Sequence, residues 1–215
     1  MNVGILGSGD VGKALGRGFA AHGHDVMIGS RTPEKPELKA WAKEVGKKGS
    51  VGTFDKAAAH GELLVLCTQG AATEAVIDLA GPRHFDGKVV IDVTNPLDFS
   101  KGMPPGLFVG TTDSLGERIQ RKVPKAKVVK CFNIVSNVTM INPKMKDGTP
   151  DMLIAGNDAA AKKTVAGILK DWGWPEPIDV GGIDGARWLE AMVPLWVRAC
   201  QAVGSWTVGW RVLRT

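Results

Sequence analysis

The chain has 215 residues, of which 44% are hydrophobic, and a formal net charge of +5. This length suits one large domain, or one domain with a small second one, and is enough to bury a core. The basic residues are scattered and do not alternate with aromatic ones, so we expect no nucleic-acid partner. No apolar run spans a membrane without interruption, and we expect neither a membrane segment nor a signal peptide.

Strand-like and helix-like runs alternate along the first 130 residues, which predicts parallel βαβ units. The predicted strands are residues 2–6, 25–28, 51–53, 63–66, 88–92 and 127–130. The predicted helices are residues 11–21, 37–46, 54–60, 71–79 and 112–122. The strand at 63–66 is apolar throughout, as a strand buried on both faces must be. We therefore predict an α/β fold with a doubly wound parallel (Rossmann) sheet, in which ligands bind outside the carboxyl ends of the strands.

A small, mostly helical C-terminal domain is predicted after a break near residue 150. We assign residues 1–150 to the dinucleotide-binding domain and residues 151–215 to this second domain. Its predicted elements are a strand at 152–155, a helix at 159–169, a strand at 178–180 and a long apolar helix at 185–203, interrupted by Pro194. Residues 98–110 are rich in Gly, Pro and Lys and are predicted to form a mobile loop.

The most informative motif lies between the first predicted strand and the first predicted helix. Gly7, Gly9 and Gly12 have the G-x-G-x-x-G spacing of a dinucleotide site. Gly7 would turn the chain sharply, Gly9 would let the pyrophosphate approach the backbone, and Gly12 would let the helix pack closely. The N–H groups at the helix start would then bind the phosphates. The cofactor-binding residues predicted here are Gly7, Ser8, Gly9, Asp10, Val11 and Gly12.

The residues after the second predicted strand distinguish NADP from NAD. An NAD enzyme places Asp or Glu there to bind the ribose 2′-hydroxyl. This chain has Ser30, Arg31 and Thr32 and no carboxylate. A guanidinium and two hydroxyls suit a 2′-phosphate, so the sequence predicts NADP(H) as the cofactor.

Further cofactor contacts are predicted at the ends of the fourth and fifth strands. Thr68 and Gln69 could hydrogen-bond the ribose or the adenine edge, although capping of the next helix is an equally good interpretation. Thr94, Asn95 and Pro96 follow the fifth strand. Because a residue before proline is extended, the backbone and amide of Asn95 would lie near the nicotinamide.

We predict no catalytic side chain and no metal site. None of the four histidines follows a predicted strand, and no Ser–His–Asp order or metal cluster is apparent. Asp92 could be a catalytic carboxylate, but an Asp in this position more often accepts local hydrogen bonds. Phe132 and Asn133 are predicted to face the same crevice. Hydride transfer between two cofactor rings needs no proton transfer at carbon, only correct placement of the rings.

The cysteines and tryptophans give weaker indications. Cys67, Cys131 and Cys200 match neither a disulfide framework nor a zinc site, and they fit a reducing cytoplasm. Six of the seven tryptophans lie between Trp172 and Trp210. We interpret them as anchors in the core or at a subunit interface, in preference to a ring that stacks on a second substrate.

Four runs together resemble the NADP oxidoreductases that depend on coenzyme F420. They are GSGDVG (7–12), IGSRTP (28–33), DVTNP (92–96) and CFNI (131–134). The N-terminal half is also similar to the NADPH domain of the STEAP ferric reductases. The resemblance implies a Rossmann domain with a small C-terminal domain, a homodimer, NADPH contacts from residues 7–12, Ser30 and Arg31, and a deazaflavin lying across the nicotinamide.

The sequence departs from these enzymes after the sixth predicted strand. Residues 132–137 read FNIVSN, where the archaeal enzymes carry a His- and Pro-containing stretch used for the deazaflavin. Our first hypothesis is therefore an NADPH-dependent oxidoreductase with a small-molecule redox acceptor. This acceptor is coenzyme F420, FAD or FMN. The second hypothesis is a non-catalytic NADP(H) sensor. The third is a reductase of a small imine or carbonyl, with Asp92 or Lys130 as proton donor.

Overall fold

The structure is a computed structural model that describes residues 1–213. The strands of its main sheet are β1 (Asn2–Leu6), β2 (Asp25–Gly29), β3 (Gly49–Gly52), β4 (Leu63–Leu66), β5 (Val89–Asp92), β8 (Lys127–Lys130), β9 (Leu153–Gly156) and β10 (Ile178–Asp179). The α-helices are α1 (Asp10–Ala21), α2 (Pro36–Val45), α3 (Phe54–His60), α4 (Thr73–Ala80), α5 (Leu115–Lys122), α6 (Ala159–Asp171) and α7 (Ala186–Val203). A separate two-stranded sheet contains β6 (Leu97–Asp98) and β7 (Gly106–Leu107).

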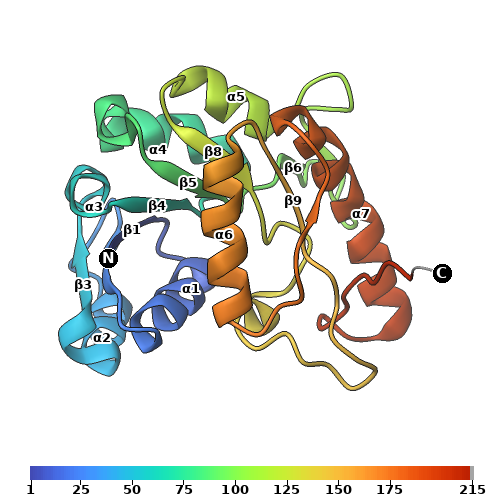
Figure 1. The fold of residues 1–215 in the computed structure, drawn as a ribbon, viewed down its shortest axis with the longest axis horizontal. Helices are drawn as coiled ribbons and strands as arrows, with labels where there is room; N and C mark the ends of the chain where they lie inside the picture. Colours follow the sequence, from blue (N-terminus) through green and yellow to red (C-terminus); the bar gives the residue numbers. More distant parts are fainter. Residues whose placement is uncertain (214–215) are drawn as a thin grey trace.

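The strand order of the main sheet is β10-β9-β8-β5-β4-β1-β2-β3. From β1 the chain runs outward through β2 to β3 and then crosses back to β4, on the other side of β1. Helices α1, α2 and α6 pack on one face of the sheet, and α3, α4 and α5 pack on the other (Figure 1). The predicted doubly wound Rossmann fold is therefore confirmed. The carboxyl ends of β1 and β4 form its switch point, where such sheets bind ligands.

The sheet continues beyond residue 150. β9 pairs with β8 in antiparallel orientation, and β10 then pairs with β9 in parallel orientation. We predicted a parallel sheet for the first domain and assigned the strands at 152–155 and 178–180 to the second, so their addition to the main sheet through an antiparallel pair is a finding of the structure. A parallel return needs a crossover, usually a helix, and the chain between β8 and β9 forms only a short 3-10 helix (Asn137–Thr139). The division into two domains at residue 150 stays a prediction.

Helix α5 begins three residues later than predicted because of its N-cap. The Ser114 Oγ accepts a hydrogen bond from the Glu117 backbone N–H at 3.1 Å and donates one to Glu117 Oε2 at 2.7 Å. The Ser114 side chain thus caps the helix, which starts at Leu115. The predicted loop at 98–110 is likewise more regular than expected, since it includes the β6–β7 pair beside α7 (Figure 1).

The tryptophans of the C-terminal part fall into two groups. Trp172 and Trp174 are buried, and the Trp172 ring meets Phe19 edge-on with centroids 4.7 Å apart. The Trp174 indole N–H donates to the Met140 carbonyl at 2.9 Å. These two residues confirm the predicted role as core anchors. By contrast, Trp188 on α7 is 61% exposed.

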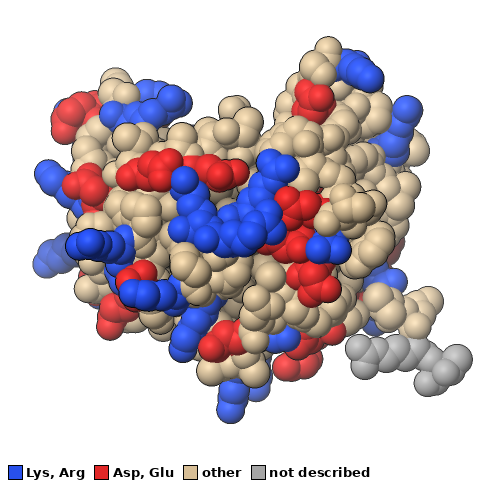
Figure 2. All heavy atoms as spheres, turned by 90° about the horizontal axis from the view of Figure 1, so that it is seen from above, with Lys and Arg blue, Asp and Glu red and all other residues tan. Residues whose placement is uncertain are grey.

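Charged side chains of opposite sign lie next to one another over α5. Figure 2 shows basic side chains in the middle of this face and acidic side chains on either side. Arg118 and Arg121 pair with Asp113, and Lys122 pairs with Asp78. The face therefore presents ion pairs and no broad patch of one sign. Among residues 1–213, no helix combines the length and the apolar character that crossing a membrane requires.

Candidate functional site

A cavity of about 700 Å³ opens at the carboxyl ends of β1, β2 and β4. Its volume lies within the range of roughly 300–1,000 Å³ that is usual for small-molecule sites, and its place is the switch point of the sheet. It is lined by Gly7, Ser8, Gly9, Ser30, Arg31, Thr32, Lys35, Phe54, Cys67, Thr68, Gln69, Ala72, Ala75, Val76 and Leu79. Eight predicted cofactor-binding residues thus meet around one cavity.

The three glycines of the first loop have different tasks. Gly7 has a φ of 138°, and a Cβ there would lie 2.6 Å from the Cys67 carbonyl oxygen. A Cβ on Gly12 would lie 2.0 Å from the Gly7 carbonyl oxygen. A Cβ on Gly9 would meet no protein atom within 4 Å. Gly7 and Gly12 are therefore required by the fold, whereas the bare backbone at Gly9 leaves room that a phosphate group can fill.

Two cations and a hydroxyl lie beside this loop. Ser30 Oγ accepts hydrogen bonds from Ser8 Oγ at 3.3 Å and from the Thr32 N–H at 3.2 Å. Arg31 is exposed, and within residues 1–213 its guanidinium forms no ion pair. Lys35 lines the same wall. Sequence reasoning missed Lys35, although a second cation four residues after Arg31 was a usable signal. Such groups suit a phosphate.

The opposite wall of the cavity is apolar. Phe54 comes from the start of α3, and Val76 and Leu79 come from α4. Leu79 is 57% exposed, so the wall is open to a ligand. Burial raises the pKa of the Cys67 thiol to about 12, which keeps it protonated and unreactive. This apolar wall suits a flat ring, and the local sequence does not reveal it because its residues come from two helices.

Thr68 and Gln69 differ in their surroundings. The Thr68 hydroxyl lies 2.9 Å from the hydroxyl of Thr73, the first residue of α4, and the Thr73 hydroxyl donates to the Gln69 carbonyl at 3.3 Å. Neither the Thr68 nor the Gln69 side chain caps a backbone N–H of the following helix, so the capping interpretation is not borne out, and the predicted cofactor contact of Thr68 stays a prediction. The Gln69 side chain is exposed at the cavity. Its predicted cofactor contact stays a prediction.

The other predicted residues do not line the cavity. Asp10, Val11 and Gly12 form the first turn of α1, and the Asp10 side chain is 82% exposed and paired with Lys13. Thr94 is 2% exposed. For these residues, as for Asn95 and Pro96, a contact with the cofactor stays a prediction.

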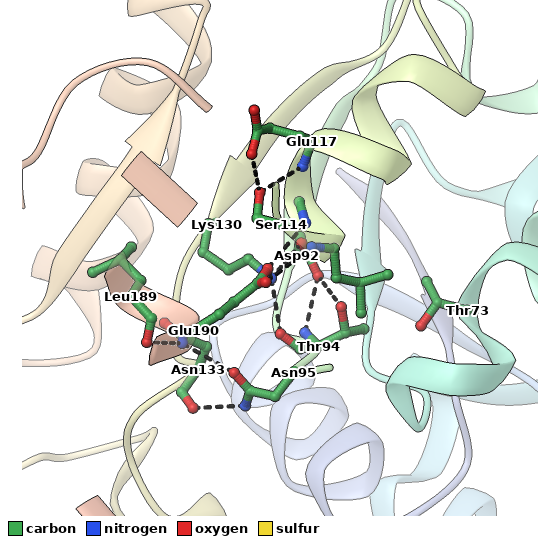
Figure 3. Close-up of polar contacts among 12 residues, drawn as sticks. Thr73, Asp92, Thr94, Asn95, Ser114, Glu117, Lys130, Asn133, Leu189 and Glu190 are labelled. Carbon is green, nitrogen blue, oxygen red and sulfur yellow. Dashed lines mark hydrogen bonds and ion pairs between the residues drawn. The ribbon is translucent and has the colours of Figure 1, made fainter. Parts of the chain in front are cut away.

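A second polar group lies at the ends of β5 and β8, around a buried lysine (Figure 3). Lys130 Nζ lies 2.7 Å from Asp92 Oδ2, 2.7 Å from Glu190 Oε1 and 2.8 Å from the Thr94 carbonyl oxygen. Glu190 also accepts hydrogen bonds from the first two backbone N–H groups of α5. Burial would lower the pKa of the Lys130 ammonium, but the two carboxylates outweigh it and raise that pKa. We call Asp92, Lys130 and Glu190 the buried triad.

The buried triad is structural in character. Asp92 Oδ1 accepts hydrogen bonds from the Thr94 N–H at 2.9 Å and the Thr94 hydroxyl at 2.6 Å, which confirms our interpretation of Asp92 as a local acceptor. All three charged side chains are at most 2% exposed. Asp92 and Lys130 therefore cannot reach a substrate as proton donors without a large rearrangement. Sequence reasoning missed Glu190, which is sixty residues from Lys130 and gives no local signal.

Two amide side chains link the same strand ends to α7 (Figure 3). Asn133 Nδ2 donates to Asn95 Oδ1 at 3.0 Å and to the Leu189 carbonyl at 2.8 Å. Asn95 Nδ2 donates to the Asn133 carbonyl at 2.8 Å. Asn133 is 6% exposed and does not line the cavity, so its place at the crevice stays a prediction. Phe132, predicted to face the same crevice, does not: it has a φ of 62°, and its ring packs 5.7 Å from that of Trp172 in the core. This left-handed backbone turns its side chain away from Asn133.

The fold and the cavity define the class of this protein. A Rossmann sheet, a glycine loop with open space at Gly9, and cations in place of the NAD-type carboxylate are the features of an NADP-dependent oxidoreductase.

Comparison with known proteins identifies the family. Residues 2–96 match the family described as NADP oxidoreductase, coenzyme F420-dependent. The F420-dependent NADP reductase of Methanocaldococcus jannaschii is 31% identical over 207 residues, which cover 91% of this chain and 90% of that protein. The chain therefore belongs to the F420-dependent NADP reductase family, and it is an NADPH-dependent oxidoreductase.

Two other similarities fit this assignment. A crystal structure of a candidate F420-dependent NADP reductase from Arthrobacter sp. FB24 has 40% identity and a TM-score of 0.95, and the match covers 100% of both chains. The metalloreductase STEAP3 of Rattus norvegicus is 28% identical over 198 residues. These residues cover 90% of this chain but 37% of STEAP3, so this chain spans little more than a third of that relative.

Proposed function

We propose that the cavity at β1, β2 and β4 binds NADP(H) in a defined orientation. The 2′-phosphate would contact Ser30, Arg31, Thr32 and Lys35, and the pyrophosphate would lie over Gly9 at the start of α1. The adenine would lie against the apolar wall near Gln69. One observation carries this proposal. The open space at Gly9 and the Arg31 guanidinium, which has no ion-pair partner within residues 1–213, lie in the same cavity.

The nicotinamide end would then point toward the ends of β5 and β8. The backbone of Asn95 and Pro96 and the amide of Asn133 would border the ring. The bound nicotinamide supplies a hydride. The protein supplies a rigid edge, because the buried triad and the two asparagines hold both strand ends in place. Orientation of the two reacting rings is the main contribution expected of the chain.

We propose coenzyme F420 as the acceptor, with FAD and FMN as the alternatives. The name shared by the Methanocaldococcus and Arthrobacter relatives supports a deazaflavin. The burial of Asp92 and Lys130 disfavours reduction of a small imine or carbonyl, because that reaction needs a proton donor. Hydride transfer between two rings does not need one at carbon.

An anaerobic turnover assay tests this proposal. NADPH would be mixed with the protein and, in parallel, with oxidised F420, FAD, FMN or a ferric chelate. We expect rapid loss of the absorbance of oxidised F420. Turnover with FAD or FMN alone would reassign the acceptor. NADPH binding without turnover of any acceptor would contradict the enzymatic proposal and favour a sensor.

We further propose a cytoplasmic homodimer whose interface includes the outer face of α7. Trp188 and Leu195 lie seven residues apart on one helix face and are 61% and 58% exposed, and Trp206 beyond the helix is 53% exposed. Exposed apolar patches of this kind mark interaction surfaces. Sedimentation should show a dimer that Leu195→Glu converts to a folded monomer, whereas a wild-type monomer would contradict the proposal. The three free thiols fit a reducing compartment.

A further inference from the structure

A second cavity, of about 740 Å³, lies between the loop after β8 and the chain after α7. The chain turns back after α7 and runs beside that loop (Figure 1). The Asp151 N–H donates to the Trp210 carbonyl at 2.8 Å, and the Trp196 indole donates to the Val208 carbonyl at 2.8 Å. The first bond joins the two walls, and the second fixes the chain after α7 to the helix. The cavity is therefore formed by the fold of the C-terminal part, and it shares no lining residue with the first cavity.

The lining of this cavity is cationic. In the part of the chain that the structure describes, Lys144, Lys146 and Arg211 line it, against a single carboxylate, that of Asp147. Among residues 1–213, none of these four side chains takes part in an ion pair. Elsewhere on the surface the cations commonly have partners, as Lys122 does. Three cations gathered without matching carboxylates repel one another, and an anionic ligand would relieve that repulsion.

The hydroxyl groups of the lining suit the same kind of ligand. Thr149, Ser205 and Thr207 add hydroxyls beside the cations, although the Ser205 and Thr207 hydroxyls bond to each other at 2.8 Å, so that only one of these two O–H groups is free to donate. Phosphate and carboxylate groups are the ligands that ammonium, guanidinium and hydroxyl donors recognise. The volume far exceeds the roughly 30 Å³ that one water molecule occupies in the liquid, so several anionic groups can enter together. We infer that this cavity binds an oligoanion that carries phosphate or carboxylate groups.

Such an oligoanion has two possible sources, a free molecule or the anionic tail of the redox acceptor. The second source rests on the proposed function. Asn133 contacts the Leu189 carbonyl near the start of α7, and Val203 at the end of α7 lines the second cavity. Fourteen residues of helix separate these points by about 21 Å. Only an acceptor with a long tail could reach both places.

Calorimetric titration with tripolyphosphate and with citrate at low salt tests the inference directly. We expect both to bind the wild type, and the double variant Lys144→Gln/Arg211→Gln to bind at least tenfold more weakly. Asp147→Asn should strengthen binding severalfold, because it removes the one carboxylate that residues 1–213 contribute to the lining. Lys163→Gln, which removes an exposed cation on α6, is the matched control and should change nothing. Thermal unfolding would verify that each variant is folded.

Kinetics with two deazaflavins separate the sources. If the cavity holds the acceptor tail, the double variant should raise the KM for F420 at least tenfold and leave the KM for its phosphate-free form unchanged. If the ligand is a free oligoanion, only the titrations should change. The inference is overturned if the wild type binds neither probe and the KM for F420 is the same in both proteins. If the proposed function is wrong, neither deazaflavin will be turned over. The titrations alone would then decide whether the second cavity binds an oligoanion.

Discussion

The cavity at β1, β2 and β4 and the buried triad lie at the same edge of the sheet, but their polar groups have opposite surroundings. In the cavity, Arg31 is exposed and has no ion-pair partner within residues 1–213, and the backbone at Gly9 faces open space. In the triad, Lys130 has two carboxylates and a carbonyl oxygen around it and no contact with solvent.

This difference separates binding groups from structural ones. A polar group without a protein partner can form its hydrogen bonds with a ligand. A group whose partners all belong to a buried network fixes the positions of the segments that it joins. The triad joins three segments of the chain, namely β5, β8 and α7, at the place where the nicotinamide would lie. Its task is then to keep the strand ends in position beside the cavity that we propose for the cofactor.

The largest expected effect comes from removing the cation of the buried triad. Lys130→Met leaves the carboxylates of Asp92 and Glu190 buried without their cation, so the free energy of unfolding should fall by about 3–5 kcal/mol. Urea unfolding at pH 7 measures this loss. Lys163→Met, an exposed control on α6, should change it by less than about 0.5 kcal/mol. A loss below about 1 kcal/mol for Lys130→Met would mean that the triad does not hold the strand ends.

Removing the exposed cation Arg31 should weaken NADPH binding without affecting the fold. Arg31→Ala should weaken NADPH binding by about 1.5–3 kcal/mol and leave NADH binding nearly unchanged, because only NADPH carries the 2′-phosphate. Lys35→Ala should have a smaller effect in the same direction, about 0.2–1 kcal/mol. Fluorescence titration with both cofactors measures the effects. Lys39→Ala on α2 serves as the control, and equal weakening of NADPH and NADH by Arg31→Ala would refute the assignment.

Two variants of the glycine loop, at Gly9 and Gly12, should separate an effect on cofactor binding from an effect on stability. Gly9→Val should keep the melting temperature and weaken both NADPH and NADH by about 1–3 kcal/mol, because its side chain would fill the space proposed for the pyrophosphate. Gly12→Ala should lower the melting temperature, since its Cβ would collide with the Gly7 carbonyl. Unchanged cofactor affinity in Gly9→Val would remove the loop from the proposed site.

A small pH dependence of stability is expected at the junction of α5 and α7. Arg187 donates two hydrogen bonds to the Glu117 carboxylate and holds its pKa below the ordinary 4.5. A carboxyl group with a lowered pKa stabilises the fold above its unfolded-state pKa, and this contribution is lost as the pH falls through the folded-state value. Glu117→Gln should therefore cost about 1 kcal/mol at pH 7 and progressively less below about pH 4.5. A constant cost in urea unfolding down to pH 3 would contradict this.

Much of the fold could be predicted because its signals are local. Strands such as β1 and β4 are short apolar runs, and the glycine spacing of the first loop is read within six residues. The change of direction at β9 could not be read in this way, because it depends on the absence of a crossover helix after β8. The side chain of Phe132 was misplaced because a left-handed backbone at a bulky residue has no signal in the sequence.

The sequence by itself determined the class of fold, the cofactor loop and the preference for NADP over NAD, because each depends on residues that are neighbours in the chain. Only the tertiary structure decided that Asp92 and Lys130 are buried partners of Glu190, and that Lys35, Phe54 and Leu79 line the same cavity as the glycine loop. It also decided that a second, cationic cavity exists. The physical reason is that long-range packing sets the distance between side chains on different elements, and sequence periodicity reports only which face of an element is buried.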